Sequence, residues 1–187
     1  MRKMTGKFTR GTNKLFKRFR VATAGAIAIE FALIFPVMVT IYFGVVEMSQ
    51  GLAASRKVTM VTSTVGDLVA QFSSVGPTAM SGVYAASAEI MRPYDTGGSG
   101  QLKINVYSIS TDPADDWSHT NGNGSCSGGT PTVPANLLAS GGSVIVSRVC
   151  YVHNSVLHRF FTSDPTFTDT FFLRPRQTDL ITWDATL

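Results

Sequence analysis

Hydrophobic residues follow two different patterns along the first part of the chain. Between Arg20 and Glu47 the sequence reads VATAGAIAIEFALIFPVMVTIYFGVV, and its apolar run of about 23 residues is long enough to cross a bilayer as a helix. From Leu52 to Phe72 apolar positions recur every three to four residues, which predicts a helix with one apolar stripe. No proline or loop-like cluster separates the two patterns, so we expect one long helix from about residue 26 to 72.

Two features of this helix follow from its sequence. Pro36 lies inside the apolar run, where it removes one helical hydrogen bond and is expected to kink the helix. The apolar stripe of the second half is expected to pack against the chain's own soluble domain rather than against other subunits. The stripe consists of Ala54, Val58, Val61, Val65, Leu68, Val69 and Phe72.

The remaining sequence predicts a mixture of helix and strand. A second helix is expected over 77–91, because Pro77 suits a first turn and Arg92-Pro93 ends the pattern. A third, short helix is expected over 156–161. Residues 111–142 are rich in Asp, Asn, Gly, Ser and Pro and are expected to be mostly loop. Apolar alternation predicts strands over 101–110, 143–153 and 166–173. The expected fold class is α+β: a long membrane-spanning helix that continues into a small helix-plus-antiparallel-sheet domain.

Charge is unevenly distributed and fixes an expected orientation. Residues 1–24 carry eight of the sixteen Lys and Arg residues and no acid, whereas the rest of the chain has a net charge of −4. Such an arm can bind nucleic acid, but directly before an apolar span it more simply keeps its side of the membrane cytoplasmic, so no nucleic-acid partner is expected. The expected parts are a cytoplasmic leader (1–25), a transmembrane helix (26–47), its periplasmic extension (48–76) and a soluble α+β domain (77–187).

Alternatives stay open for the N-terminal region. The arm is either disordered or an amphipathic helix on an anionic membrane surface, since Leu15, Phe16 and Phe19 alternate with basic residues. A cleaved secretory signal would need a shorter apolar core before a small-residue cleavage site. Small residues do occur at 51–55, but the apolar region before them is too long, which favours a retained anchor.

The two cysteines are expected to form a disulfide. Cys126 and Cys150 both fall in the part expected outside the cytoplasm, where disulfides persist. No third cysteine competes, so a disulfide is favoured over two unrelated thiols. It would stabilise the fold by about 3 kcal/mol in the chain-entropy model. No C-x-x-C or H-x-x-x-H spacing is present, so no metal site is expected.

Candidates for catalysis or ligand binding are weak. The oxygen-rich loop with Asp112, Asp115, Asp116 and His119 fits no EF-hand spacing, and a solvated loop is favoured over a calcium site. A nucleophile–base pair is conceivable from Ser155 with His153 or His158, but no elbow motif or third member accompanies it, and the histidines are expected to cap or edge structure. We expect no enzymatic activity and no cofactor.

Glu30 is the residue that most needs an explanation. It is the sole side chain of the apolar run that is charged at neutral pH, and a carboxylate there costs roughly 2.5–3.5 kcal/mol. One interpretation is a side chain that reaches back toward the cytoplasmic face. The other requires cleavage after Gly25, which would create a charged amine on Ala26 for a neighbouring subunit's Glu30 to neutralise. Glu30 would then set register and assembly.

The same stretch resembles the TadE/TadF-like family, the minor pseudopilins of tight-adherence (Flp-type) pilus systems. The family pattern is G-x-x-x-x-E-F-A, then Leu, an apolar pair, Pro and a long apolar run ending in Gly and Glu. Here these are Gly25, Glu30, Phe31, Ala32, Leu33, Pro36, Gly44 and Glu47. The C-terminal half is similar in outline, with a Val-rich strand carrying Cys150-Tyr151 and a late Arg174-Pro175-Arg176.

The resemblance implies a biological role. A prepilin peptidase would cut between Gly25 and Ala26, and the mature protein would stay in the inner membrane, or enter a short pseudopilus, with its soluble domain in the periplasm. Its partners would be other pilins and pseudopilins, the inner-membrane assembly platform and the lipid bilayer. Major Flp pilins are much shorter and usually carry Tyr where this chain has Phe31, which favours an accessory subunit. The alternatives are a single-span anchor for a periplasmic enzyme or binding domain and, more weakly, a phage coat-like protein.

Overall fold

The structure, a computed structural model, describes residues 23–94, 101–124, 126–134, 136–154 and 164–187. The chain divides into two compact units, Met1–Val46 and Glu47–Leu187. The first unit holds the apolar half of helix α2 (Thr23–Ala70), and the second holds the rest of α2 with all the other elements. The extension expected over 48–76 therefore belongs to the same unit as the sheet.

Helix α2 is continuous over 48 residues and includes Pro36. This confirms the long helix predicted from the two hydrophobic patterns. The helix ends at Ala70 rather than Phe72, because the N–H groups of Gln71 and Phe72 donate to carbonyls three residues back, those of Leu68 and Val69. Such bonds tighten the last turn into 3₁₀ geometry and satisfy carbonyls at the helix end.

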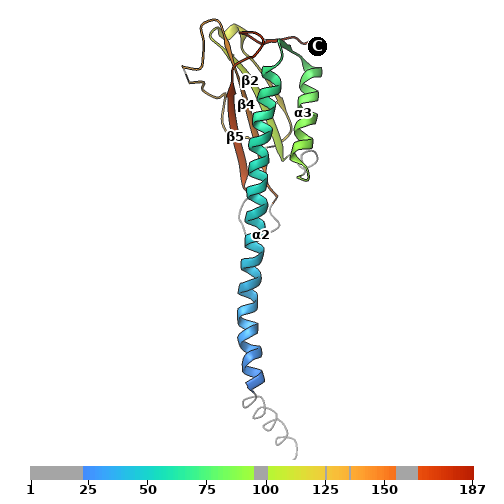
Figure 1. The fold of residues 1–187 in the computed structure, drawn as a ribbon, viewed down its shortest axis with the longest axis vertical. Helices are drawn as coiled ribbons and strands as arrows, with labels where there is room; N and C mark the ends of the chain where they lie inside the picture. The colour runs from blue at the N-terminus through green and yellow to red at the C-terminus, as the bar shows by residue number, and fades with distance from the viewer. Residues whose placement is uncertain (1–22, 95–100, 125, 135, 155–163) are drawn as a thin grey trace, which may run out of the picture. The chain divides into compact units, whose positions relative to one another are not determined.

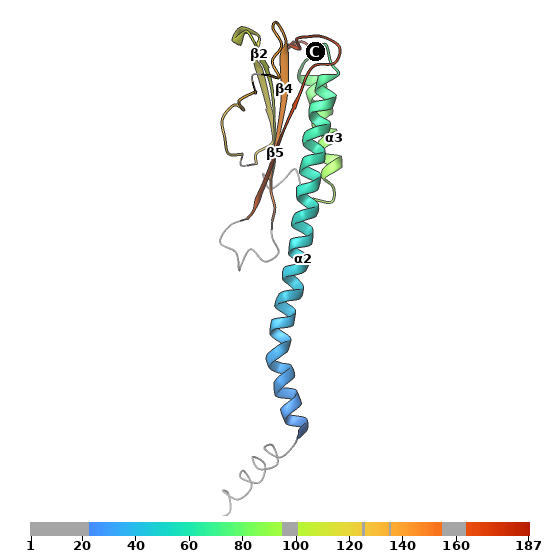
Figure 2. The ribbon, with the colours of Figure 1, turned by 60° about the vertical axis from the view of Figure 1, so that its left-hand side comes forward.

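The second unit is a helical layer on an antiparallel sheet. Helix α3 (Pro77–Met91) begins with its proline in the first turn, as predicted. The sheet has the order β3-β2-β4-β5, with every neighbouring pair antiparallel. Its strands are β2 (Leu102–Ser110), β3 (Trp117–Asn121), β4 (Ser143–Val152) and β5 (Thr166–Leu173). Figure 1 and Figure 2 show α3 and the second part of α2 on one face of this sheet. These elements confirm the α+β class.

Four short elements were not predicted. Within the segment expected to be mostly loop, η1 (Pro113–Asp115) is followed by β3, which pairs with β2 at one edge of the sheet. Strands β1 (Ser74–Val75) and β6 (Thr182–Trp183) form a separate parallel pair. The helix expected over 156–161 lies outside the described residues.

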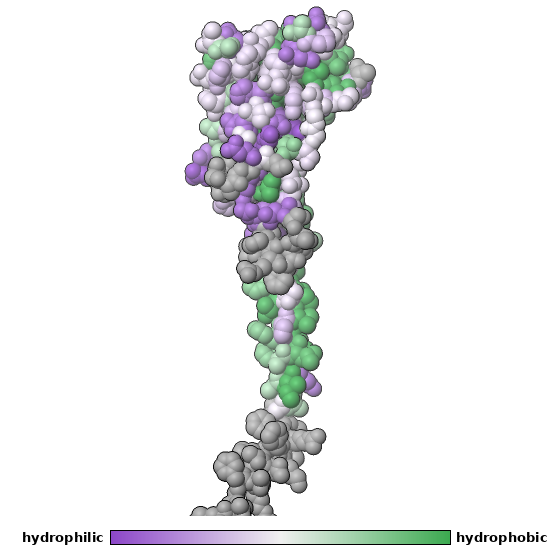
Figure 3. All heavy atoms as spheres, turned by 180° about the vertical axis from the view of Figure 1, so that it is seen from behind, coloured by the Kyte–Doolittle hydropathy of each residue, from purple (hydrophilic) through white to green (hydrophobic). Residues whose placement is uncertain are grey.

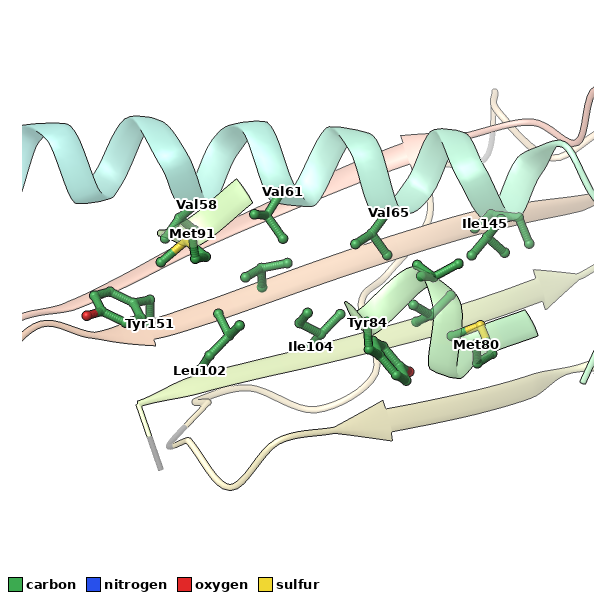
Figure 4. Packing of buried hydrophobic residues seen from close by; sticks show 14 of the residues in the cluster. Val58, Val61, Val65, Met80, Tyr84, Met91, Leu102, Ile104, Ile145 and Tyr151 are labelled. Atoms are coloured by element: carbon green, nitrogen blue, oxygen red, sulfur yellow. The ribbon is translucent and has the colours of Figure 1, made fainter. Parts of the chain in front are cut away.

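The core lies between the helical layer and the sheet. The stripe residues Ala54, Val58, Val61, Val65 and Val69 are fully buried, and Leu68 and Phe72 are partly buried against the same cluster. Figure 4 shows Val58, Val61 and Val65 on the side of α2 that faces the sheet, in one cluster with Leu102 and Ile104 of β2 and Ile145 and Tyr151 of β4. This confirms that the stripe packs on the chain's own domain. Helix α3 adds Met80, Val83, Tyr84, Ser87 and Met91, and Ile90 packs partly buried against the same cluster.

The outer face of the sheet is also covered. Side chains alternate along a strand, so Val144, Val146 and Cys150 of β4 point away from the helices, yet all three are buried. The segment between β3 and β4 lies over them: Arg148 donates from Nη1 to the carbonyl of Gly129 (2.7 Å), and Cys150 is bonded to Cys126. From β5's end, Arg174 donates to the carbonyl of Leu137 (3.0 Å). The segment between β3 and β4 thus serves as a second covering layer.

Candidate functional site

The apolar half of α2 exposes an unusual amount of hydrophobic surface. Its large apolar side chains are exposed by between 47% (Phe43) and 73% (Leu33). They are Ile27, Ile29, Phe31, Leu33, Ile34, Phe35, Val37, Met38, Ile41, Tyr42, Phe43 and Val45. On the face seen in Figure 3, hydrophobic residues dominate this part of the helix. Water-soluble surfaces rarely carry such a patch, and α2 is long and apolar enough to cross a membrane.

The predicted processing residues lie together at the start of this surface. Gly25 and Ala26 fall in the first turn of α2, and Glu30 follows one turn later, exposed. Residues three and four apart share a helix face, so the Glu30 carboxylate lies on the same face as Ala26 and Ile34. Phe31 is also exposed, and its ring centroid lies 5.5 Å from that of Phe35. A carboxylate is thereby presented on an otherwise apolar helix.

Pro36 interrupts the hydrogen-bond ladder of the same segment. Proline has no N–H, so the carbonyl of Ala32 loses its usual helical donor. Four residues on, Thr40 donates from Oγ1 to the carbonyl of Pro36 (2.8 Å). Farther along, the rings of Tyr42 and Phe43 meet edge to face at 5.8 Å. The amphipathic ring of Tyr42 suits the headgroup level of a bilayer. The expected kink at Pro36 stays a prediction.

A second polar feature lies at the start of the second unit, Glu47–Leu187, which is called the soluble unit from here on. Glu47 of α2, which is partly buried, pairs with His153, which is buried just after β4, with 3.5 Å between Glu47 Oε1 and His153 Nε2. The backbone N–H of His153 donates to the carbonyl of Pro165. Sequence reasoning noted both residues separately but not the pair. The one local signal for a polar site here was the position of Glu47, an acidic residue directly after the apolar run.

Three of the candidate residues for catalysis or metal binding make side-chain hydrogen bonds within the fold. Asp112 and Asp116 each accept a backbone N–H through their carboxylates, from Ala114 and Ser110. The described part of the chain holds no group of three or more potential metal ligands. His119 shares a 2.9 Å hydrogen bond between its Nδ1 and the hydroxyl of Tyr84, and burial raises the pKa of Tyr84. Ser155 and His158 lie outside the described residues.

The predicted cysteine pair is joined in the structure. Cys126 and Cys150 form a disulfide with 5.4 Å between their Cα atoms, a separation ordinary for such bonds. Cys150 is fully buried on the outer face of β4, and Cys126 lies in the segment that covers this face. The bond therefore fixes the covering segment to the middle of the sheet.

Comparison with known proteins gives one result. A family model for TadE-like proteins matches residues 25–66. This confirms, for that part of the chain, the resemblance expected from the sequence. The matched segment lies entirely within α2 and includes Glu30, Pro36 and Glu47. No curated protein and no solved structure matches the chain.

Proposed function

We propose that this protein is a minor pseudopilin, an accessory structural subunit of a tight-adherence (Flp-type) pilus system, with no enzymatic activity of its own. The observation that carries the proposal is Glu30, the one residue from Gly25 to Val46 that is charged at neutral pH, within the segment that matches TadE-like proteins. A simple anchor gains nothing from a carboxylate at this depth, whereas an assembly subunit can use it for pairing.

The proposed mechanism begins with cleavage by a prepilin peptidase between Gly25 and Ala26. The cut removes the basic leader and leaves a positively charged amine on Ala26. Glu30 then lies in the first turns of the mature helix, where its carboxylate pairs with the amine of a neighbouring subunit. Each charge compensates the desolvation that the other would suffer alone in hydrocarbon. The pair can form only at one axial offset between two neighbouring helices. The pairing therefore fixes the register of one subunit against the next.

The distribution of charge and cysteine supports an arrangement in the inner membrane. The basic residues before α2 keep the N-terminus cytoplasmic, and the unit from Glu47 onward lies in the periplasm, where the Cys126–Cys150 disulfide persists. The partners are the peptidase, other pilins and pseudopilins, the membrane assembly platform and lipid. The helix-and-sheet unit distinguishes this subunit from a short bulk fibre protein.

Mass spectrometry of the N-terminus tests the proposal directly. The protein is extracted from membranes of cells with and without the prepilin peptidase. A chain that begins at Ala26 only when the peptidase is present is the expected result. An intact Met1 in both strains would contradict it and leave a signal-anchored enzyme or binding domain. A start near Ala54 would mean ordinary secretion with loss of the whole apolar segment.

A further inference from the structure

The pair formed by Glu47 and His153 is enclosed at one end of the soluble unit. The two side chains are exposed by only 14% and 6%. Three aromatic rings surround the imidazole, with centroids 6.1 Å away for Phe167, 6.2 Å for Tyr94 and 6.4 Å for Tyr151. These rings exclude water, so the attraction within the pair is screened less than on the surface.

Four structural elements meet at this pair. Glu47 comes from α2, His153 follows β4, and Tyr94 follows α3 and donates from its hydroxyl to the α2 carbonyl of Gln50. From β5, the ring of Phe167 lies against Gly51 of α2, where an added Cβ would be 3.5 Å from it. The pair therefore joins the start of the α2 segment within the soluble unit to the adjoining ends of β4 and β5.

The charge state of the imidazole decides how strongly the two residues attract. The titratable groups next to His153 are Glu47, Tyr94 and Tyr151, together with Asp164, which precedes the Pro165 that accepts the His153 N–H. Farther along the same elements lie Arg56, Lys57 and Asp67 of α2, Glu89 of α3, Arg148 of β4 and Asp169 of β5. Among these groups, the Glu47 carboxylate forms the ion-pair contact with the imidazole, with its Oε1 3.5 Å from His153 Nε2. A buried carboxylate is costly unless a positive charge or hydrogen bonds compensate it. Histidine is the side chain that gains such a charge between pH 8 and pH 5.

We propose that Glu47 and His153 form a pH-dependent clamp. When the imidazole is protonated, the ion pair holds the β4 and β5 ends on the α2 segment that begins at Glu47. When the imidazole is neutral, this attraction is lost and the ends separate from α2 more often. Glu47 lies within the segment that matches TadE-like proteins, whereas His153 lies outside it, so the clamp is a property of this chain's own soluble unit.

Hydrogen exchange measures the opening of the clamp. The full-length protein is exchanged in detergent micelles at pH 5.5 and pH 8, and each rate is corrected by the intrinsic rate for an unstructured peptide. Peptides covering 47–52 and 148–153 are expected to open on the order of tenfold less often at pH 5.5. His153→Phe keeps a ring in the cage but removes the charge, and is expected to abolish the difference.

Two further variants make the result decisive. Glu47→Gln keeps the shape and the imidazole, so it decides the question if His153→Phe fails to fold, and it too is expected to abolish the difference. His119→Phe removes another partly buried imidazole elsewhere in the unit. This variant should keep the difference in opening between pH 5.5 and pH 8. Equal opening of the wild type at both pH values, or a pH difference that survives in Glu47→Gln, would overturn the proposal. The readout is local opening, so it is independent of pilus assembly.

Discussion

Ser147 on β4 donates a hydrogen bond from its hydroxyl to the backbone carbonyl of Thr62 on α2, with 2.7 Å between the two oxygens. Both residues are fully buried. A side chain as short as serine reaches a helix carbonyl only where sheet and helix approach closely. One turn further along α2 is Gly66, and a Cβ there would lie 2.9 Å from Ser147 Oγ and would overlap the Leu173 side chain. The absence of a side chain at Gly66 therefore permits the contact.

Replacement of Gly66 by alanine is expected to destabilise the soluble unit. Overpacking against Leu173 and Ser147 costs about 1–3 kcal/mol, which outweighs the gain of about 0.5–1 kcal/mol that alanine usually brings to a helix. Urea unfolding of the micelle-solubilised protein, followed by circular dichroism, measures the difference. Gly82→Ala on α3 is the matched control, because an added Cβ there meets nothing within 4 Å, and it should be neutral or stabilising. Equal stabilisation by both changes would refute the tight packing at Gly66.

Tyr84 gives a prediction for alkaline pH. Burial raises its pKa above the ordinary value near 10, so the folded state holds this proton more tightly than the unfolded chain. Its contribution is fully present below pH 10 and is lost as the pH rises further. The free energy of unfolding should therefore fall above pH 10, and fall less steeply in Tyr84→Phe. Tyr84→Phe should also lower the free energy of unfolding at neutral pH by about 0.5–1.5 kcal/mol, because it removes the hydrogen bond to His119.

The control for Tyr84 is another tyrosine of the same unit. Tyr107→Phe, on the outer face of β2, should keep the wild-type fall in stability above pH 10. Unfolding curves at pH 8, 9, 10 and 11 would compare the three proteins. A Tyr84→Phe protein that loses stability as steeply as the wild type would assign the alkaline transition to other groups.

Removal of the disulfide is expected to cost about 3 kcal/mol of unfolding free energy. The double variant Cys126→Ser, Cys150→Ser should also loosen the covering segment, since only non-covalent contacts, such as the hydrogen bonds from Arg148 and Arg174, would then hold it over the sheet. Limited proteolysis should then cut within 122–142 faster than in the wild type, while α3 stays protected. The idea fails if the oxidised wild type and the double variant are cut at the same rate.

Substitution of Glu30 separates assembly from anchoring. Glu30→Gln should still be inserted in the membrane, but incorporation into the pseudopilus should fall severely, because a neutral amide cannot neutralise the amine of a neighbouring subunit. Co-purification with other pilus subunits measures incorporation, and the N-terminal mass reports processing. Glu89→Gln, at an exposed glutamate of α3 paired with Arg92, should leave both unchanged. Normal incorporation of Glu30→Gln would contradict the pairing mechanism.

Much of the fold was predictable because its signals are local. The stripe from Ala54 to Val69 has helical spacing, and Pro77 indicates the start of α3. Strand β4 is buried on both faces and reads as a Val-rich run, which predicts a strand from composition alone. These elements owe their type to residues that are neighbours in the sequence.

The parts that could not be predicted depend on distant partners. Strand β3 reads WSHTN, is mostly exposed on one face, and is extended because its backbone pairs with β2. Strands β1 and β6 are each two residues long, and they pair segments that lie more than 100 residues apart in the sequence, Ser74–Val75 and Thr182–Trp183. Glu47 and His153 likewise meet only in the folded chain. Glu30, in contrast, could be singled out as a candidate from the sequence, because one charge in an apolar run is itself a local signal.

The covering segment over β4 is attached through a single covalent bond, and this has a consequence for the order in which the protein matures. Before Cys126 and Cys150 are oxidised, nothing covalent keeps this segment over Val144 and Val146. In a reducing compartment, the covering segment of a newly made chain would shield the outer face of β4 less well from water and from other chains. The mature outer surface of the sheet is therefore secured only in an oxidising compartment, which makes cellular location a condition of the finished fold.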